Sequence, residues 1–93
     1  MIRSFKGRLT ASIDDGSVKK GFPGDLVRRA QQLLTIMDAA AELNDLRSPP
    51  GNRLEKLSGD REGQHSIRIN KQWRICFVWT DAGPENVEVT DYH

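Results

Sequence analysis

The spacing of apolar residues divides the chain into a helix-forming part and a strand-forming part. From residue 24 to residue 41, apolar positions recur with the period of one helix face. They are Leu26, Ala30, Leu33, Met37 and Ala41. Pro23 and Asp25 suit a first helical turn. The pattern therefore predicts a helix from Gly24 to Ala41 whose apolar stripe faces a core.

The signals before this helix are shorter. Ile2 to Phe5 predicts a short strand. Leu9 to Ile13 predicts one or two helical turns, which Asp14-Asp15-Gly16 would end because this run favours a break. After the long helix, Pro49-Pro50-Gly51 excludes regular structure.

Beyond this break the spacing changes to strict alternation, which indicates strands. The predicted strands are Arg53 to Leu57, His65 to Asn70, Gln72 to Thr80 and a last one from Val87 to Asp91. In the third strand one face carries Trp73, Ile75, Phe77 and Trp79, and the other carries Arg74, Cys76 and Val78. The turns Asn70-Lys71 and Asp81 to Pro84 predict an antiparallel meander.

These elements predict one α+β domain over residues 1–93, with an N-terminal strand and helices packed on an antiparallel β-sheet. The length of 93 residues fits a single domain. Because the helix covers one face of the sheet, the other face is expected to be open.

Composition excludes several classes of protein. The single cysteine forms no internal disulfide, and there is no cluster of ligands for a metal and no motif for another cofactor. No stretch is apolar enough for a membrane span. We therefore expect a soluble, cytoplasmic protein without cofactor.

The net charge of +1 hides a strong division along the chain. Residues 47–74 carry seven basic against three acidic side chains, whereas residues 75–93 carry four acidic and no Lys or Arg. A basic block fits a polyanion such as RNA, and it equally fits a solvated surface.

Two groups of residues suggest chemistry. Arg68 and Arg74 lie on neighbouring strands, and on one face they would form a pair of guanidinium forks suited to phosphate. The alternative is that each arginine packs beside the core or pairs with Glu55, Glu62 or Glu88. The closing Asp91-Tyr92-His93 offers acid–base groups and a ring that can stack on a base, or it is a frayed tail.

Five segments together give the chain its family resemblance. They are Pro-Pro-Gly-Asn-Arg-Leu at 49–54, Leu-Ser-Gly-Asp-Arg-Glu-Gly at 57–63, Ser-Ile-Arg-Ile-Asn at 66–70, Gln-Trp-Arg-Ile-Cys-Phe at 72–77 and the terminal Asp-Tyr-His. In this order and spacing they resemble the HigB toxins of the RelE superfamily, also called plasmid-maintenance killer proteins. The resemblance covers essentially the whole chain.

The resemblance implies a fold with two N-terminal helices against an antiparallel sheet. It implies the toxin of a type II toxin–antitoxin system, a ribosome-dependent and metal-independent endoribonuclease that cleaves mRNA and halts translation. The implied partners are the ribosome and mRNA, and a HigA-like antitoxin with a helix-turn-helix domain. Operator DNA would be bound only through the toxin–antitoxin complex.

The resemblance also assigns residues. The catalytic set is Arg61, Arg74, Asp91, Tyr92 and His93, and the expected substrate-binding residues are Glu55, Lys56, Ser58 and Arg68. Ser58 stands where several relatives carry a lysine, and Glu55 matches a histidine of some relatives. Either Glu55 acts as the base while the arginines supply charge, or the enzyme is weaker than its relatives. Alternation places Lys56 one position out of phase with Glu55.

Two other functions remain as alternatives. The chain could be a catalytically attenuated module that acts mainly with its antitoxin in promoter autoregulation, which Ser58 motivates. Nonspecific RNA binding is less favoured, because Trp73, Phe77 and Trp79 fit a core face better than an exposed stacking platform.

Overall fold

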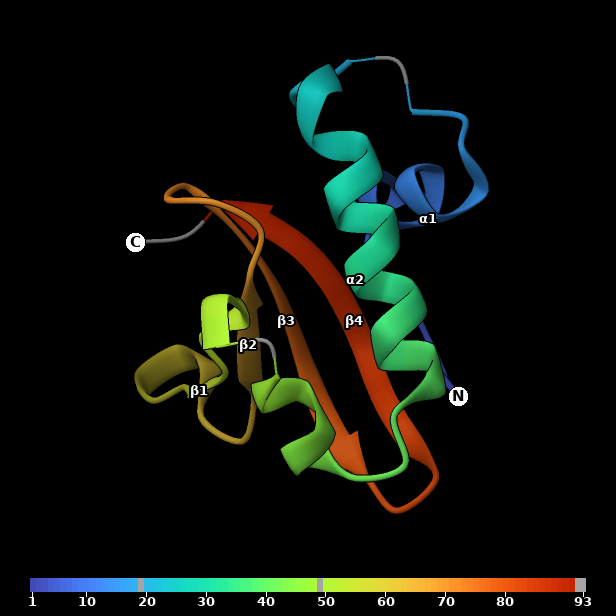
Figure 1. Ribbon diagram of the computed structural model, residues 1–93. Helices are drawn as coiled ribbons and strands as arrows, with labels where there is room; N and C mark the ends of the chain where they lie inside the picture. Colours follow the sequence, from blue (N-terminus) through green and yellow to red (C-terminus); the bar gives the residue numbers. More distant parts are fainter. Residues whose placement is uncertain (19, 49, 92–93) are drawn as a thin grey trace.

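A computed structural model describes residues 1–18, 20–48 and 50–91. Two helices pack against a four-stranded antiparallel sheet of order β1-β2-β3-β4 (Figure 1). The predicted α+β class is confirmed. The elements are α1 (Arg8–Asp15), α2 (Val27–Ala39), β1 (Glu55–Lys56), β2 (His65–Arg68), β3 (Trp73–Thr80) and β4 (Gly83–Asp91), with short 3-10 turns η1 (Gly24–Leu26), η2 (Leu43–Arg47), η3 (Pro50–Asn52) and η4 (Gly59–Arg61). No helix in these described ranges is long and apolar enough to cross a membrane.

Both predicted helices form. The first ends at Gly16, whose φ of 81° is the left-handed conformation that glycine adopts readily. The long helix begins with the 3-10 turn η1 and then continues as α2. It ends at Ala40, where the backbone turns extended, so Ala41 lies outside it.

The strands differ from the prediction mainly at their ends. The strand predicted over residues 53–57 shrinks to Glu55–Lys56, because Arg53 has a φ of 48°, outside the extended region that regular strand residues occupy. The N-terminal strand reduces to one parallel bridge between Phe5 and Val87. Gly83 and Pro84, predicted as turn residues, instead open β4.

A bulge in β4 fits the N-terminal segment to the sheet. Cys76 is aligned with Glu88, but Val78 is aligned with Glu85, so β4 contains one extra residue. Asn86, at a φ of 52°, lies in this bulge and its backbone N–H donates to the Ser4 hydroxyl at 2.8 Å. The edge of β4 is therefore partly covered by the start of the chain.

The core lies between the helices and one face of the sheet. Ile67, Ile75 and Phe77 are fully buried, as the alternation predicted, and Trp73 and Trp79 pack against the same cluster. The rings of Trp73 and Phe22 form a T-shaped pair with a centroid distance of 4.9 Å. These aromatic residues are therefore core groups, which removes the stacking platform that nonspecific RNA binding would need.

Candidate functional site

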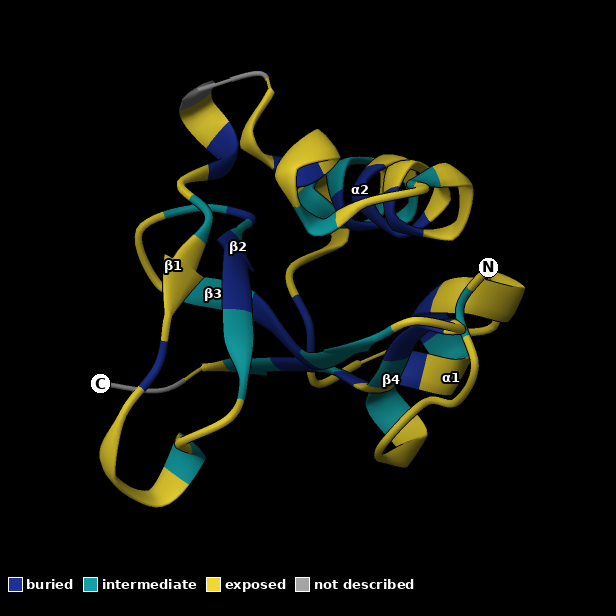
Figure 2. Ribbon diagram, turned by 90° about the horizontal axis from the view of Figure 1, so that it is seen from below, coloured by how far each residue is buried: buried dark blue, intermediate teal, exposed yellow. Residues whose placement is uncertain are grey.

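Two arginines face each other across the central hairpin of the sheet. Arg68 of β2 is the direct cross-strand partner of Arg74 in β3, so both project from one face. Their neighbours Ile67 and Ile75 point the other way, into the core under α2. Figure 2 shows α2 on one side of the sheet, and the segment linking β1 to β2 on the other. We call the surface opposite α2 the arginine face.

Arg74 of β3 reaches across the two strands on one side of it, β2 and β1. Its Nη1 donates to the Ser66 hydroxyl at 3.3 Å, and its Nη2 lies 3.5 Å from the Glu55 carboxylate. The sequence left two roles open for Arg74, a guanidinium pair with Arg68 for phosphate or an ion pair with a carboxylate. The structure shows both features, because Arg74 shares a face with Arg68 and also pairs with Glu55. The Glu55 carboxylate thus lies beside the Arg74 guanidinium, where it could accept a proton next to a phosphate bound by that arginine.

Arg61 reaches the same face from the η4 turn. Its Nη1 lies 3.1 Å from the Glu88 carboxylate and donates to Gln64 at 3.2 Å. The side chains of Arg61 and Glu88 are 26% and 23% exposed, so the pair is largely shielded from water. Two arginine–carboxylate pairs thus stand on one sheet face, at its β1 and β4 sides.

Cys76 lies beneath these pairs, between Ser66 and Glu88 in the register. The thiol is fully buried, and this burial raises its pKa to about 11. A thiolate nucleophile is therefore disfavoured at neutral pH. Cys76 is therefore a packed, buried thiol.

Lys56 is separated from the arginines. It is the cross-strand partner of His65, whereas Glu55 is the partner of Ser66 on the arginine face. The His65 ring stacks on Phe77 at 6.2 Å, and burial, then the charges of Lys56 and Arg47, lower its pKa. Lys56 therefore adds its charge to the face that carries α2.

The remaining predicted site residues do not all share the arginine face. The Arg68 Nε donates to the Asn70 carbonyl at 3.0 Å, and Ser58 is exposed just before η4. Asp91 is aligned with Trp73, so the register places it on the side of the core, and Thr90 is the residue that shares the arginine face with Arg74. The Asp91 carboxylate accepts from Gln72 at 2.8 Å. The predicted Tyr92 and His93 lie outside the described residues.

Sequence reasoning missed part of this arrangement. It named Glu88 only as one of several partners for Arg68 or Arg74, whereas the carboxylate pairs with Arg61. Ser66, buried and bonded to Arg74, was not singled out. Alternation puts both on the open face, but only the strand register shows which arginine each one meets.

The geometry suits binding and stabilising an anion. Guanidinium groups match the paired oxygens of phosphate, and carboxylates beside them can accept protons. Within residues 1–18, 20–48 and 50–91, no three His, Cys, Asp or Glu side chains gather as metal ligands would.

The fold and the arginine face together define a class of protein. Its members are small two-layer α+β proteins in which the sheet face not covered by the helices carries basic side chains. The YoeB–YefM complex from Staphylococcus aureus contains a chain of this fold, with a TM-score of 0.64, 20% identity, and coverage of 100% of this chain and 95% of that one. The family of HigB-like toxins, described as RelE-like toxins of type II toxin–antitoxin systems, matches residues 4–93. The chain belongs to this family, which confirms the resemblance.

The names of two similar curated proteins are consistent with this family. Toxin HigB-1 of Vibrio cholerae is 40% identical over 83 residues, which cover 88% of this chain and 87% of that protein. Endoribonuclease HigB of Proteus vulgaris is 33% identical over 93 residues and covers both chains fully. An uncharacterized protein of Haemophilus influenzae is 35% identical over 78 residues, which cover 84% of this chain and 72% of that protein.

Proposed function

We propose that this toxin is a ribosome-dependent endoribonuclease that cleaves mRNA without a metal ion and thereby inhibits translation. The observation that carries the proposal is the arginine face, on which Arg61 and Arg74 project beside two carboxylates. The full-length similarity to a protein named endoribonuclease supports the same chemistry.

Cleavage of RNA at a 2′-hydroxyl has three chemical needs. A base must take the hydroxyl proton, cations must stabilise the charge that develops on the phosphate, and an acid must protonate the leaving 5′-oxygen. The guanidinium groups of Arg61 and Arg74 supply the charge, with Arg68 beside them. The ribosome would hold the mRNA in line, which lowers the demand on each acid–base group.

Glu55 is the base that the described residues favour, since its carboxylate lies 3.5 Å from Arg74 on the arginine face. In this scheme His93 is the acid, Tyr92 stacks on the nucleotide and Asp91 orients the end of the chain. Ser58 contacts the RNA backbone at the rim.

The regulatory partner in this proposal is a HigA-like antitoxin with a helix-turn-helix domain, which neutralises the toxin and binds operator DNA. The family description, a type II toxin–antitoxin system, supports such a partner. We place the activity in the cytoplasm, where ribosomes and mRNA are found.

An attenuated toxin is the second candidate. Ser58 is exposed before η4 and brings a hydroxyl where a lysine of relatives would bring charge. In that case the chain would pair with its antitoxin and tune promoter repression, but it would not arrest growth.

Induced expression with mapping of mRNA 5′ ends distinguishes the two. The wild type should arrest growth and create new ends within codons, and Arg74→Ala should abolish both. Lys71→Ala, which removes an exposed cation next to the same strand, is the matched control and should behave as wild type. Growth without new ends in the wild type, together with tight operator binding by the toxin–antitoxin pair, would select the attenuated module.

A further inference from the structure

Two rows of side chains cross the strands on the arginine face. The first row runs over all four strands and consists of Glu55, Ser66, Cys76 and Glu88. Its two ends are acidic, whereas the two residues at its centre, Ser66 and Cys76, are small and 0% exposed. The second row consists of Arg68, Arg74 and Thr90. Because the small centre of the first row is fully covered, longer side chains must lie over it.

The Arg74 side chain is one of these covering groups. Arg74 is two residues from Cys76 on β3, so it is a diagonal neighbour of Ser66, within reach of a long side chain. Its Nη1 donates to the Ser66 hydroxyl at 3.3 Å, and its Nη2 lies 3.5 Å from the Glu55 carboxylate. Burial raises the pKa of the Cys76 thiol, and the positive charges of Arg61 and Arg74 oppose this rise, which agrees with both arginines lying near the centre of the row. The Arg74 guanidinium therefore reaches from β3 over β2 toward β1.

Ser66 is the firmer of the two contacts that hold this guanidinium. The Glu55 side chain is 48% exposed and belongs to a strand of two residues, and an ion pair with an exposed carboxylate holds a side chain weakly. Ser66, by contrast, is fully buried in β2, between β1 and β3. A planar guanidinium held at Nη2 alone can turn about that contact, whereas a second contact at Nη1 fixes its plane. The Ser66 hydroxyl therefore sets the direction in which Arg74 presents its charge.

We propose that Ser66 is a positioning residue for mRNA cleavage, whose hydroxyl orients the Arg74 guanidinium toward the scissile phosphate and beside Glu55. This inference rests on the proposed function, in which Arg74 stabilises the phosphate charge. Because Ser66 is fully buried, it does not touch the RNA and acts only through Arg74. Ser66→Ala keeps the charge of Arg74 but frees its guanidinium to turn. The loss should therefore appear in the cleavage step and not in binding to the ribosome.

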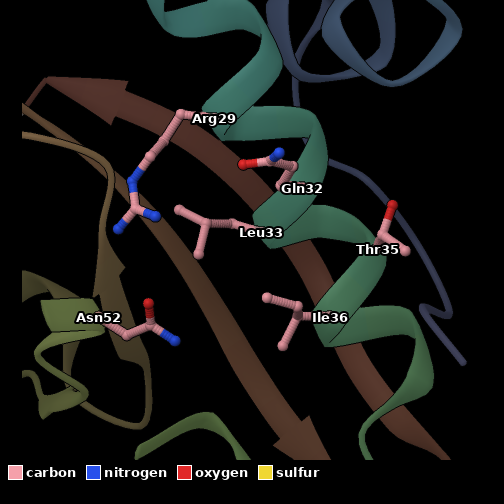
Figure 3. A pocket seen from close by; sticks show the side chains of 6 residues that line it. All are labelled: Arg29, Gln32, Leu33, Thr35, Ile36 and Asn52. Atoms are coloured by element: carbon pink, nitrogen blue, oxygen red, sulfur yellow. The ribbon is translucent and has the colours of Figure 1, made fainter. Parts of the chain in front are cut away.

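The orientation of Arg74 can be measured without any substrate, by ¹⁵N NMR relaxation of arginine Nε–H groups in the full-length protein. Arg74→Lys identifies the Arg74 signal. In Ser66→Ala its order parameter should fall by about 0.2, most of the difference between a rigid and a flexible N–H group. Arg29 is the reference in the same spectrum, because its Nε donates to the Ile69 carbonyl at 3.4 Å. It lines a cavity of about 360 Å³ on the side of the sheet that carries α2 (Figure 3), so its signal should not change.

The effect on the reaction is measured with programmed ribosomes. The single-turnover cleavage rate of Ser66→Ala should fall about tenfold, while its affinity for the ribosome stays that of wild type. Ser12→Ala is the matched control, since it removes another serine hydroxyl, which donates to the Leu9 carbonyl within α1. It should leave the cleavage rate and the Arg74 signal unchanged. Thermal melting checks that both variants are folded.

Three results would overturn the proposal. The first is an Arg74 order parameter in Ser66→Ala equal to that of wild type. The second is an unchanged cleavage rate in Ser66→Ala when wild type cleaves. The third is an equal loss of rate in Ser66→Ala and Ser12→Ala, because the effect would then come from general loosening of the fold. If wild type cleaves no mRNA, the proposed function fails, and the NMR comparison still decides whether Ser66 orients Arg74.

Discussion

Replacing Glu88 with alanine tests how the arginine face is held in place. Glu88 accepts from Arg61 Nη1 at 3.1 Å, and Gln64 accepts from the same nitrogen at 3.2 Å. Because Arg61 comes from the short η4 turn and not from a strand, these side-chain contacts fix its guanidinium over the sheet. We expect Glu88→Ala to let Arg61 move and to lower the rate of mRNA cleavage.

The size of the effect follows from the geometry. A hydrogen bond to a charged group contributes about 1.5–3 kcal/mol. Gln64 still holds Arg61 in the variant, so we take the lower end, about 1.5 kcal/mol, which corresponds to roughly a tenfold slower step. Glu88→Gln keeps an acceptor oxygen at the same place and should lose only about threefold.

The assay is single-turnover cleavage of mRNA on programmed ribosomes, with toxin in excess so that the bound complex reacts. Glu85→Ala, on the same strand, is the control and should cleave at the wild-type rate. Thermal melting checks that each variant is folded. A rate for Glu88→Ala equal to that of wild type would refute the reasoning, as would an equal loss in Glu88→Gln and Glu88→Ala.

Three other predictions concern stability and reactivity. The buried Thr10 hydroxyl accepts from the Val89 backbone N–H at 2.8 Å, so Thr10→Val should reduce the free energy of unfolding by about 1–3 kcal/mol. The control Thr35→Val removes an exposed hydroxyl and should change the free energy of unfolding, measured by denaturant titration, by less than about 0.5 kcal/mol. Equal losses of stability in the two variants would contradict the role given to the Thr10 hydrogen bond. The pKa of His65 is held below its ordinary value of 6.5, first by burial and then by nearby positive charge, so the unfolded chain takes up a proton first on acidification. Stability should therefore fall as the pH drops below about 6.5, and less steeply in His65→Asn; identical slopes would remove His65 as a cause. Burial raises the pKa of the Cys76 thiol to about 11, so a thiol reagent at pH 8 should label it only in denaturant, whereas rapid labelling of the native protein would show that the thiol is accessible.

The sequence predicted the elements that depend on long periodic patterns. The helix stripe from Leu26 and the alternation across β3 each bury one continuous face, so their type and inward side could be read directly. Short elements were less predictable, because contacts distant in sequence decide them. Ile2 to Phe5 forms one bridge only, since Ser4 binds the β4 bulge at Asn86.

The candidate site was predictable as a set of residue types, but not as a set of pairs. The alternation of side chains along each strand was enough to predict that Arg74 faces away from the core and that Lys56 and Glu55 point to opposite faces. The pairing of Arg61 with Glu88 depends on how η4 returns to the sheet, across 27 residues of sequence. No local pattern encodes that return.

The central claim is that the arginine face cleaves mRNA on the ribosome. The most direct test incubates the purified toxin with a defined mRNA, with and without ribosomes stalled on it, and maps the 5′ ends. We predict cleavage at the ribosome-bound codon only when ribosomes are present, and none with Arg74→Ala. Equal cleavage of free mRNA, full activity of Arg74→Ala, or intact mRNA on the ribosome with wild type would contradict the account.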